Sequence, residues 1–218
     1  LGDDPVTHIV ADIKKRNLDR GATIMDVSGS YSPYSFIHQL VNSLGARAVT
    51  ALIDRVRLVK SPAEQAYLRE AATITDVGTQ AALDAFAEGT VDYDVAAAAL
   101  SAMVKAGSEA LTCDPYICIG WRTAAPHSNR GGQVAKVEDP LFVELGATRA
   151  CYTAPLMRSA VAGRATPELS TLAEVSNAVI EAVCGSVRGG VPAAEVAAAG
   201  DAAIESLLPR ILWHHTYG

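Results

Sequence analysis

The 218-residue sequence predicts an α/β protein, with α+β character in its larger part. Residues 1–56 alternate between helical and strand patterns, which is typical of an α/β unit. Residues 112–163 are rich in β-branched and turn residues and lie between two pairs of helical patterns, which indicates antiparallel strands and hairpins. Half of the residues are hydrophobic, so a chain of this length can bury a core in one or two domains.

The first region begins with a helix that reaches Arg16. Asp4 can cap this helix and Pro5 suits its first turn, and apolar residues then recur at helical spacing. Three further elements are expected: a strand over 22–27, a helix from Ser32-Pro33 and a strand over 46–53. We interpret residues 1–56 as the C-terminal part of an N-terminal α/β domain whose beginning lies outside this sequence.

Helical patterns flank the β-rich region on both sides. Ser61 and Glu64 have capping-box spacing around Pro62, and Asp92 is interpreted as the cap of the following helix. Thr166-Pro167 repeats the same kind of start. The expected elements are helices over 62–88, 93–106, 166–184 and 192–207, with strands around 116–119, 141–145 and 160–161.

Composition excludes several classes of protein. The net charge is −6 and no block of Lys or Arg is present, which argues against a nucleic-acid-binding protein. No apolar run reaches the ~18 residues of a membrane span. The spacing of Cys113, Cys118, Cys151 and Cys184 fits no zinc-ribbon pattern. We interpret these cysteines as small buried side chains in a reducing compartment, and therefore expect a cytoplasmic protein.

Two residues in the β-rich region are candidates for acid–base chemistry. His127 opens a polar turn, where an imidazole can titrate near neutrality. Glu144 alternates with Phe142 and Gly146 on one face of a predicted strand, where partial desolvation would favour proton exchange. The plainer alternatives are a loop histidine with a local hydrogen bond, and an edge-strand glutamate paired with Arg149 or Arg158.

The order of landmarks resembles the pita-bread fold of the creatinase, prolidase, Xaa-Pro aminopeptidase and methionine aminopeptidase family. The landmarks are Lys60-Ser61-Pro62-Ala63-Glu64, Ala125-Pro126-His127, the strand pair Phe142 to Gly146 and Tyr152 to Arg158, Gly163, and Trp213-His214-His215-Thr216-Tyr217-Gly218. The resemblance implies a pita-bread catalytic domain over residues 57–218 that is truncated before its second half-sheet. It also implies a creatinase-like N-terminal domain over residues 1–56.

The sequence departs from this family at its metal-binding positions. Peptidases of the family hold two metal ions with two aspartates on neighbouring strands of one hairpin. Here Glu144 stands at the first position and Pro155, eleven residues later, at the second, where it offers no ligand. Met157 replaces the threonine of the family's Thr-Arg pair. This hairpin is most similar to the ectoine-hydrolase form, which lacks metal.

The resemblance therefore implies a hydrolase that opens a C–N bond in a creatine- or ectoine-like substrate with no metal cofactor. His127 and Glu144 would be catalytic, and Arg158, Tyr152 and His215 would contact the substrate. One alternative is a metal-dependent Xaa-Pro dipeptidase or aminopeptidase with two ions such as Mn or Co. A second alternative is an inactive family member that serves as a binding module. The expected partners are a small-molecule substrate and a second copy in a homodimer, with no nucleic acid and no membrane.

Overall fold

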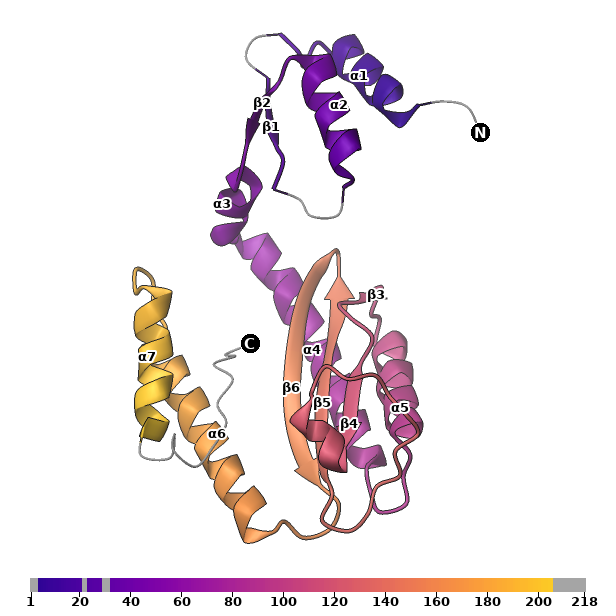
Figure 1. Ribbon diagram of the computed structural model, residues 1–218, viewed down its shortest axis with the longest axis vertical. Helices are drawn as coiled ribbons and strands as arrows, with labels where there is room; N and C mark the ends of the chain where they lie inside the picture. The colour runs from indigo at the N-terminus through magenta and orange to yellow at the C-terminus, as the bar shows by residue number, and fades with distance from the viewer. Residues whose placement is uncertain (1–3, 21–22, 29–31, 206–218) are drawn as a thin grey trace. The chain divides into compact units, whose positions relative to one another are not determined.

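The computed structural model describes residues 4–20, 23–28 and 32–205 (Figure 1). The chain divides into two compact units, of which the first ends at Pro62 and the second begins at Ala63. Within the described part of the chain, no helix is both long enough and apolar enough to cross a membrane.

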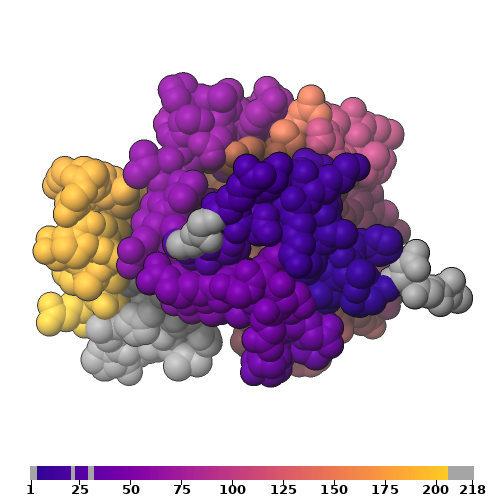
Figure 2. All heavy atoms as spheres, turned by 90° about the horizontal axis from the view of Figure 1, so that it is seen from above, coloured from indigo at the N-terminus to yellow at the C-terminus, as the bar shows by residue number. Residues whose placement is uncertain are grey.

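The first unit has the predicted alternation of helices and strands. Its elements are α1 (Pro5–Lys15), β1 (Ile24–Asp26), α2 (Tyr34–Leu44), β2 (Arg47–Val49) and α3 (Leu52–Leu58). The predicted cap of α1 is confirmed, because the Asp4 carboxylate accepts hydrogen bonds from the backbone N–H groups of Val6 and Thr7. β1 and β2 pair in parallel, and Figure 2 shows the atoms of the packed helices α1 and α2 in indigo.

The predicted strand over 46–53 is wrong in its second half. β2 ends at Val49, and Ala51 has a φ of 57°, which an extended strand cannot contain. The backbone N–H of Ile53 then donates to the Asp26 carboxylate at 2.7 Å, and α3 starts there. A contact between residues far apart in the sequence thus converts an apolar stretch with strand propensity into a helix.

In its described residues, the second unit contains one antiparallel sheet and four long helices. Its elements are α4 (Pro62–Ala85), α5 (Asp92–Lys105), β3 (Ala110–Leu111), β4 (Tyr116–Ile119), the 3₁₀ helix η1 (Gly120–Ala124), β5 (Pro140–Arg149), β6 (Tyr152–Val161), α6 (Pro167–Ser186) and α7 (Ala193–Ile204). β5 is the central strand, with β6 along one edge and both β4 and β3 along the other. α6 and α7 pack together as a helical hairpin (Figure 1).

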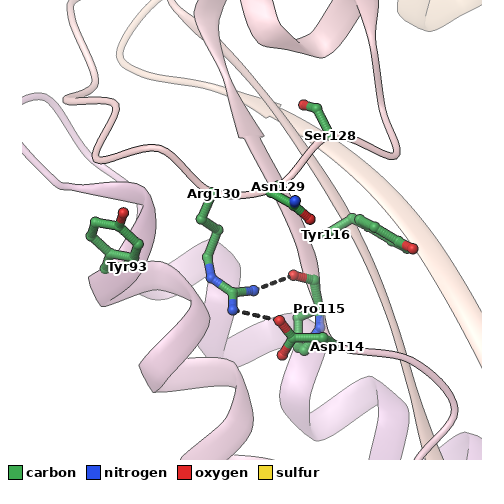
Figure 3. A pocket seen from close by; sticks show the side chains of 7 residues that line it. All are labelled: Tyr93, Asp114, Pro115, Tyr116, Ser128, Asn129 and Arg130. Atoms are coloured by element: carbon green, nitrogen blue, oxygen red, sulfur yellow. Dashed lines mark hydrogen bonds and ion pairs between the residues drawn. The ribbon is translucent and has the colours of Figure 1, made fainter.

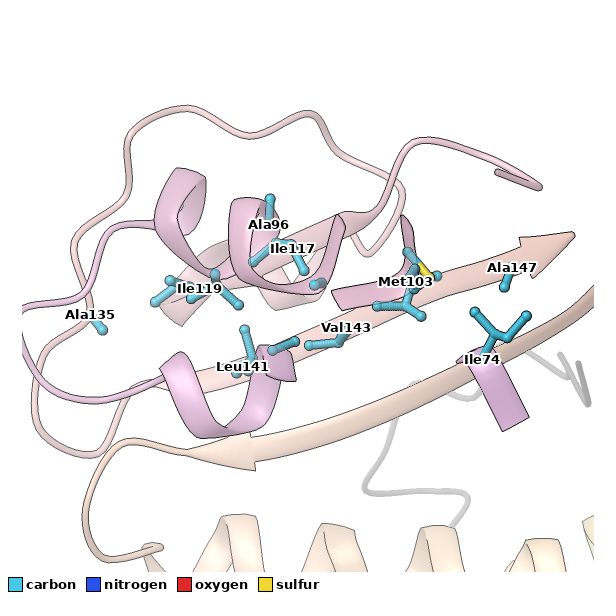
Figure 4. Packing of buried hydrophobic residues seen from close by; sticks show 13 residues of the cluster. Ile74, Ala96, Met103, Ile117, Ile119, Ala135, Leu141, Val143 and Ala147 are labelled. Atoms are coloured by element: carbon cyan, nitrogen blue, oxygen red, sulfur yellow. The ribbon is translucent and has the colours of Figure 1, made fainter. Parts of the chain in front are cut away.

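The hydrophobic core lies between one face of the sheet and the helices α4 and α5 (Figure 4). β5 contributes alternate residues to it, namely Leu141, Val143, Leu145 and Ala147, all of them buried. α4 and α5 approach closely at Gly78, where an added Cβ atom would lie 2.3 Å from Cγ of Met103. This layer fixes β5 from one side and leaves its other face for the residues described below.

Two expectations about individual residues are corrected by the structure. Asp92 does not cap α5: the capping position is Val91, and the Asp92 side chain is fully buried in the first turn. The cysteines are not all buried, because Cys151 and Cys184 are exposed and only Cys118 is fully enclosed. Cys151 lies in the tight turn between β5 and β6 and Cys184 lies within α6, and both are exposed, so neither belongs to the core.

Candidate active site

Glu144 projects from the face of β5 that is turned away from the core. Leu145 and Val143, its neighbours in sequence, are fully buried under the helices, so alternation along the strand directs Glu144 to the opposite side. Its strand partners on that side are Tyr116 of β4 and Met157 of β6. The Glu144 side chain is only 13% exposed, and the predicted alternation is confirmed.

His127 and Glu144, which lie on separate segments, meet directly. The Nε2 atom of His127 is 2.8 Å from Oε2 of Glu144, a hydrogen bond in which a ring N–H donates to the carboxylate. The imidazole also stacks on Tyr116, with ring centroids 4.7 Å apart and planes inclined by 19°. Its side chain is 66% exposed, so the pair has a shielded carboxylate and an imidazole that faces solvent.

This geometry differs from both of the plainer alternatives, a local hydrogen bond for His127 and an arginine partner for Glu144. The hydrogen bond of His127 is not local, because it joins residues that are 17 positions apart. Glu144 is paired with neither Arg149 nor Arg158: Arg149 binds Glu70 and Glu109 at the far end of the strand. A carboxylate that accepts a hydrogen bond from an imidazole N–H and so holds the ring in place is a usual arrangement for general acid–base chemistry.

The thiol of Cys113 lies close enough to Glu144 to sense its charge. Burial raises the pKa of the Cys113 thiol above its ordinary value, and the negative charges of Glu144 and Asp114 raise this pKa further. A thiol with a raised pKa stays protonated near neutral pH and is a poor nucleophile. Cys113 is therefore part of the surroundings of the pair, and the chemistry rests on the imidazole and the carboxylate.

The loop that carries His127 is held by side chains that the sequence did not single out. Cys118 contacts this loop from β4, with Sγ 3.1 Å from the carbonyl oxygen of Pro126. Arg130 donates to the carbonyl of Pro115 at 2.6 Å and to the Asp114 carboxylate at 2.5 Å (Figure 3). The polar run after His127 was the available signal for these contacts, but it does not identify their partners.

A small pocket of about 240 Å³ lies beside this loop. Its lining residues are Tyr93, Asp114, Pro115, Tyr116, Ser128, Asn129 and Arg130. Figure 3 shows the Arg130 guanidinium directed at Asp114 and Pro115, so its positive charge is already compensated within the protein. Tyr116 belongs both to this pocket and to the stack on His127.

The structure does not bring Arg158 or Tyr152 to Glu144. The strand register places Arg158 opposite Val143, on the other face of the sheet. Tyr152 donates from its hydroxyl to Glu64 of α4 at 2.9 Å and stacks on Tyr67. The prediction that these two side chains surround the same site as Glu144 is therefore corrected. His215, the third predicted contact, lies outside the described residues.

The side chains around Glu144 do not fit a pair of metal ions. Its cross-strand partner on β6 is Met157, and Pro155 lies opposite Gly146, so β6 supplies no carboxylate there. Across residues 4–20, 23–28 and 32–205, no three His, Cys, Asp or Glu side chains gather as a metal site. One carboxylate and one imidazole cannot bridge and enclose two divalent cations.

Comparison with known proteins gives consistent matches. The profile of metallopeptidase family M24 matches residues 66–217. An Xaa-Pro dipeptidase from Pyrococcus horikoshii is 26% identical over 85% of this chain and 52% of its own length. The uncharacterized hydrolase/peptidase y4tM from Sinorhizobium fredii is 26% identical over 87% of this chain and 50% of its own length. The chain thus spans about half the length of the curated relatives that it matches.

Solved structures share the same architecture. The X-Pro aminopeptidase from Thermotoga maritima superposes with a TM-score of 0.78 and 18% identity, over 94% of this chain and 58% of that one. At this identity the likeness concerns the fold alone. It confirms the predicted pita-bread arrangement for the part of the fold that the chain contains.

Proposed function

The chain belongs to metallopeptidase family M24, and we propose that it contributes a His127–Glu144 proton-transfer pair to a hydrolase that opens a C–N bond. The observation that carries this proposal is the 2.8 Å hydrogen bond between the imidazole and the carboxylate. The pair lies on the sheet face that the helices of the core leave uncovered.

The two side chains have different exposure, and this suggests different roles. His127 faces solvent, so its ring can reach a substrate and deliver a proton to the departing nitrogen or hold a water molecule. Glu144 is shielded and accepts the ring N–H, so it orients the imidazole. Positioned proton transfer of this kind contributes roughly 10²–10⁴-fold to a reaction rate.

The donors of the hairpin favour a reaction that uses no pair of metal ions at this position. Glu144 is engaged with His127, and Pro155 has neither a ligand atom in its side chain nor a backbone N–H. We therefore propose metal-independent hydrolysis of a small polar substrate, for which a creatine- or ectoine-like compound remains the hypothesis from the sequence. No step of this proposal passes through a metal ion.

A metal-dependent Xaa-Pro dipeptidase is the second candidate, and the names of the relatives favour it. The matched proteins from Pyrococcus horikoshii and Thermotoga maritima are named as an Xaa-Pro dipeptidase and an X-Pro aminopeptidase. These names favour a peptide substrate over a creatine- or ectoine-like substrate. For this candidate, the carboxylate donors would have to come from outside the described residues.

Metal analysis and turnover by the protein expressed from its complete gene test these proposals. We expect turnover of a small C–N substrate that persists after dialysis against a chelator. Glu144→Gln should abolish it, whereas Glu174→Gln, an exposed substitution on α6, should leave it unchanged. About two equivalents of bound Mn or Co with chelator-sensitive Xaa-Pro cleavage would establish the second candidate instead. Absence of any turnover would favour the binding module.

A further inference from the structure

The buried carboxylate of Asp92 has no counter-ion among the described contacts, yet it accepts three hydrogen bonds. Its Oδ2 atom accepts the backbone N–H groups of Gly131 and Gln133 at 2.9 and 3.2 Å. Its Oδ1 atom accepts the N–H of Gly132 at 3.1 Å. The side chain is fully buried, and a carboxylate without such partners would be costly to bury. These bonds therefore hold the backbone of residues 131–133 firmly against the start of α5.

We propose that Asp92 is a positioning residue for the His127–Glu144 pair, acting through the backbone of the loop that it binds. The inference rests on the proposed function for its catalytic meaning. Its structural content is independent of that function: without the Asp92 carboxylate, His127 no longer stays within hydrogen-bond distance of Glu144.

The loop that carries His127 is joined to the start of α5 a few residues after the histidine. His127 lies four residues before the first N–H group that Asp92 binds, as the numbers 127 and 131 show. Residues 131–134 are further joined to α5, because the Asp92 N–H donates to the carbonyl of Gln133 and Val134 pairs with Val91. The end of the loop is thus fixed to the rigid helix through one side chain and two backbone contacts.

The hydrogen bond between His127 and Glu144 tolerates little displacement of the loop. A hydrogen bond of 2.8 Å is lost when its atoms separate by about 1 Å, so even a modest shift of the loop breaks it. His127 is mostly exposed, and its ring also stacks on Tyr116. That stack restrains the plane of the ring but leaves the imidazole free to slide along the tyrosine face.

Other side chains also anchor the loop close to His127. Cys118 contacts Pro126 before it and Ser128 after it. Arg122 donates to the carbonyl of Asn129, and Arg130, three residues after His127, binds Asp114 and Pro115. The Arg130 contacts involve a long side chain and an exposed partner, since the Asp114 side chain is 66% exposed. Asp92 is the only one of these side chains that is both charged and fully buried, so we assign the larger positioning effect to it.

A chemical probe of histidine accessibility tests this proposal in the complete protein. Diethyl pyrocarbonate acylates neutral imidazole nitrogens, and peptide mass spectrometry resolves the rate for each histidine. In the native protein the bond to Glu144 occupies Nε2 of His127. Asp92→Asn keeps the size of the side chain but removes its charge and one acceptor. We expect the His127 rate to rise about tenfold, which corresponds to loss of about 1.4 kcal/mol of restraint.

Three comparisons make the result specific. Glu144→Gln should raise the rate of His127 in the same way, since it weakens the acceptor directly. Asp94→Asn, an exposed substitution on the same turn of α5, should leave this rate unchanged. His8 and His38, in the first unit, serve as internal references whose rates should not move in any variant.

The proposal is overturned if folded Asp92→Asn protein shows the native His127 rate, or if all histidines accelerate equally, as a purely structural role predicts. If Asp92→Asn does not fold, Asp92→Ser, which retains one acceptor oxygen, replaces it in the same assay. Turnover separates this inference from the proposed function. A faster His127 rate with a fall in kcat at nearly constant KM supports both, whereas a faster rate with unchanged turnover supports the positioning and overturns the catalytic role.

Discussion

On β5, the residues that face the helices and the residues that face the His127 loop are held in place by different forces. The helix-facing side is apolar, and each side chain is buried among several others. The opposite side depends on a few specific contacts: one hydrogen bond, one aromatic stack and the anchors of a single loop. The first side determines whether the unit folds, and the second determines whether the candidate site is assembled.

Adjacent substitutions on β5 should separate these two properties most clearly. Leu145→Ala removes a fully buried side chain and should lower the free energy of unfolding by about 2–5 kcal/mol. Glu144→Gln should change stability little but lower turnover by about 10²–10⁴-fold, because it removes the charged acceptor that orients His127 for proton transfer. Urea unfolding and steady-state kinetics on both variants measure this. The comparison fails if Glu144→Gln costs as much stability as Leu145→Ala.

Gly78 offers a smaller test that acts only on the helix-facing side. The Cβ of Gly78→Ala would lie 2.3 Å from Cγ of Met103, so the methionine must shift, at a cost of about 1–3 kcal/mol. Gly185→Ala on α6 meets nothing within 4 Å and should instead stabilise its helix by up to about 1 kcal/mol. Thermal unfolding should show a lower stability for Gly78→Ala and a higher stability for Gly185→Ala than for the native protein. Equal effects would mean that helix propensity outweighs packing at Gly78.

The parts of the fold that the sequence predicts well are those governed by neighbours in the chain. Asp4 and Thr166 cap their helices through bonds to residues two or three positions away. Alternation likewise places Glu144 opposite the core. The start of α3 and the role of Asp92 depend on bonds across 27 and about 40 residues, and no local pattern reveals those partners.

The misplacement of Arg158 and Tyr152 has a different cause, which is the register of one hairpin. β5 ends at Arg149 and β6 starts at Tyr152, so the turn contains two residues only. Both have a positive φ, 48° at Ala150 and 65° at Cys151. Turns of this kind usually contain Asn-Gly or a similar pair, so the Ala-Cys sequence gives no signal for this turn. The register of β6 is then undetermined, and a shift of one residue exchanges its two faces.

A third prediction concerns this turn, where a substitution should stabilise the β5–β6 hairpin. Cys151→Gly removes the steric conflict of a side chain at a φ of 65° and should gain about 0.5–1 kcal/mol, after the greater flexibility of glycine in the unfolded chain is allowed for. Cys184→Gly, at an exposed position inside α6, should lose about 1 kcal/mol. Loss of stability in both variants would show that the turn is not strained.

The smallest expected effect concerns the pKa of the Cys113 thiol, which responds to the charge of Glu144 on the site-facing side of β5. Burial is the main cause of its raised pKa, and the negative charge of Glu144 is the next. Glu144→Gln removes that charge, so the pKa of the thiol should fall toward its ordinary value while remaining raised by burial. More thiolate is then present at a given alkaline pH, and alkylation by iodoacetamide should accelerate a few-fold.

The pH dependence of that alkylation gives the decisive measurement, followed by mass spectrometry for each cysteine. The midpoint for Cys113 should move to lower pH in Glu144→Gln, because a neutral neighbour no longer opposes formation of the thiolate. Cys184, exposed on α6, provides the reference rate in the same sample and should not change. An unmoved midpoint would contradict this prediction, because it would show that the Glu144 charge does not contribute to the raised pKa of the thiol.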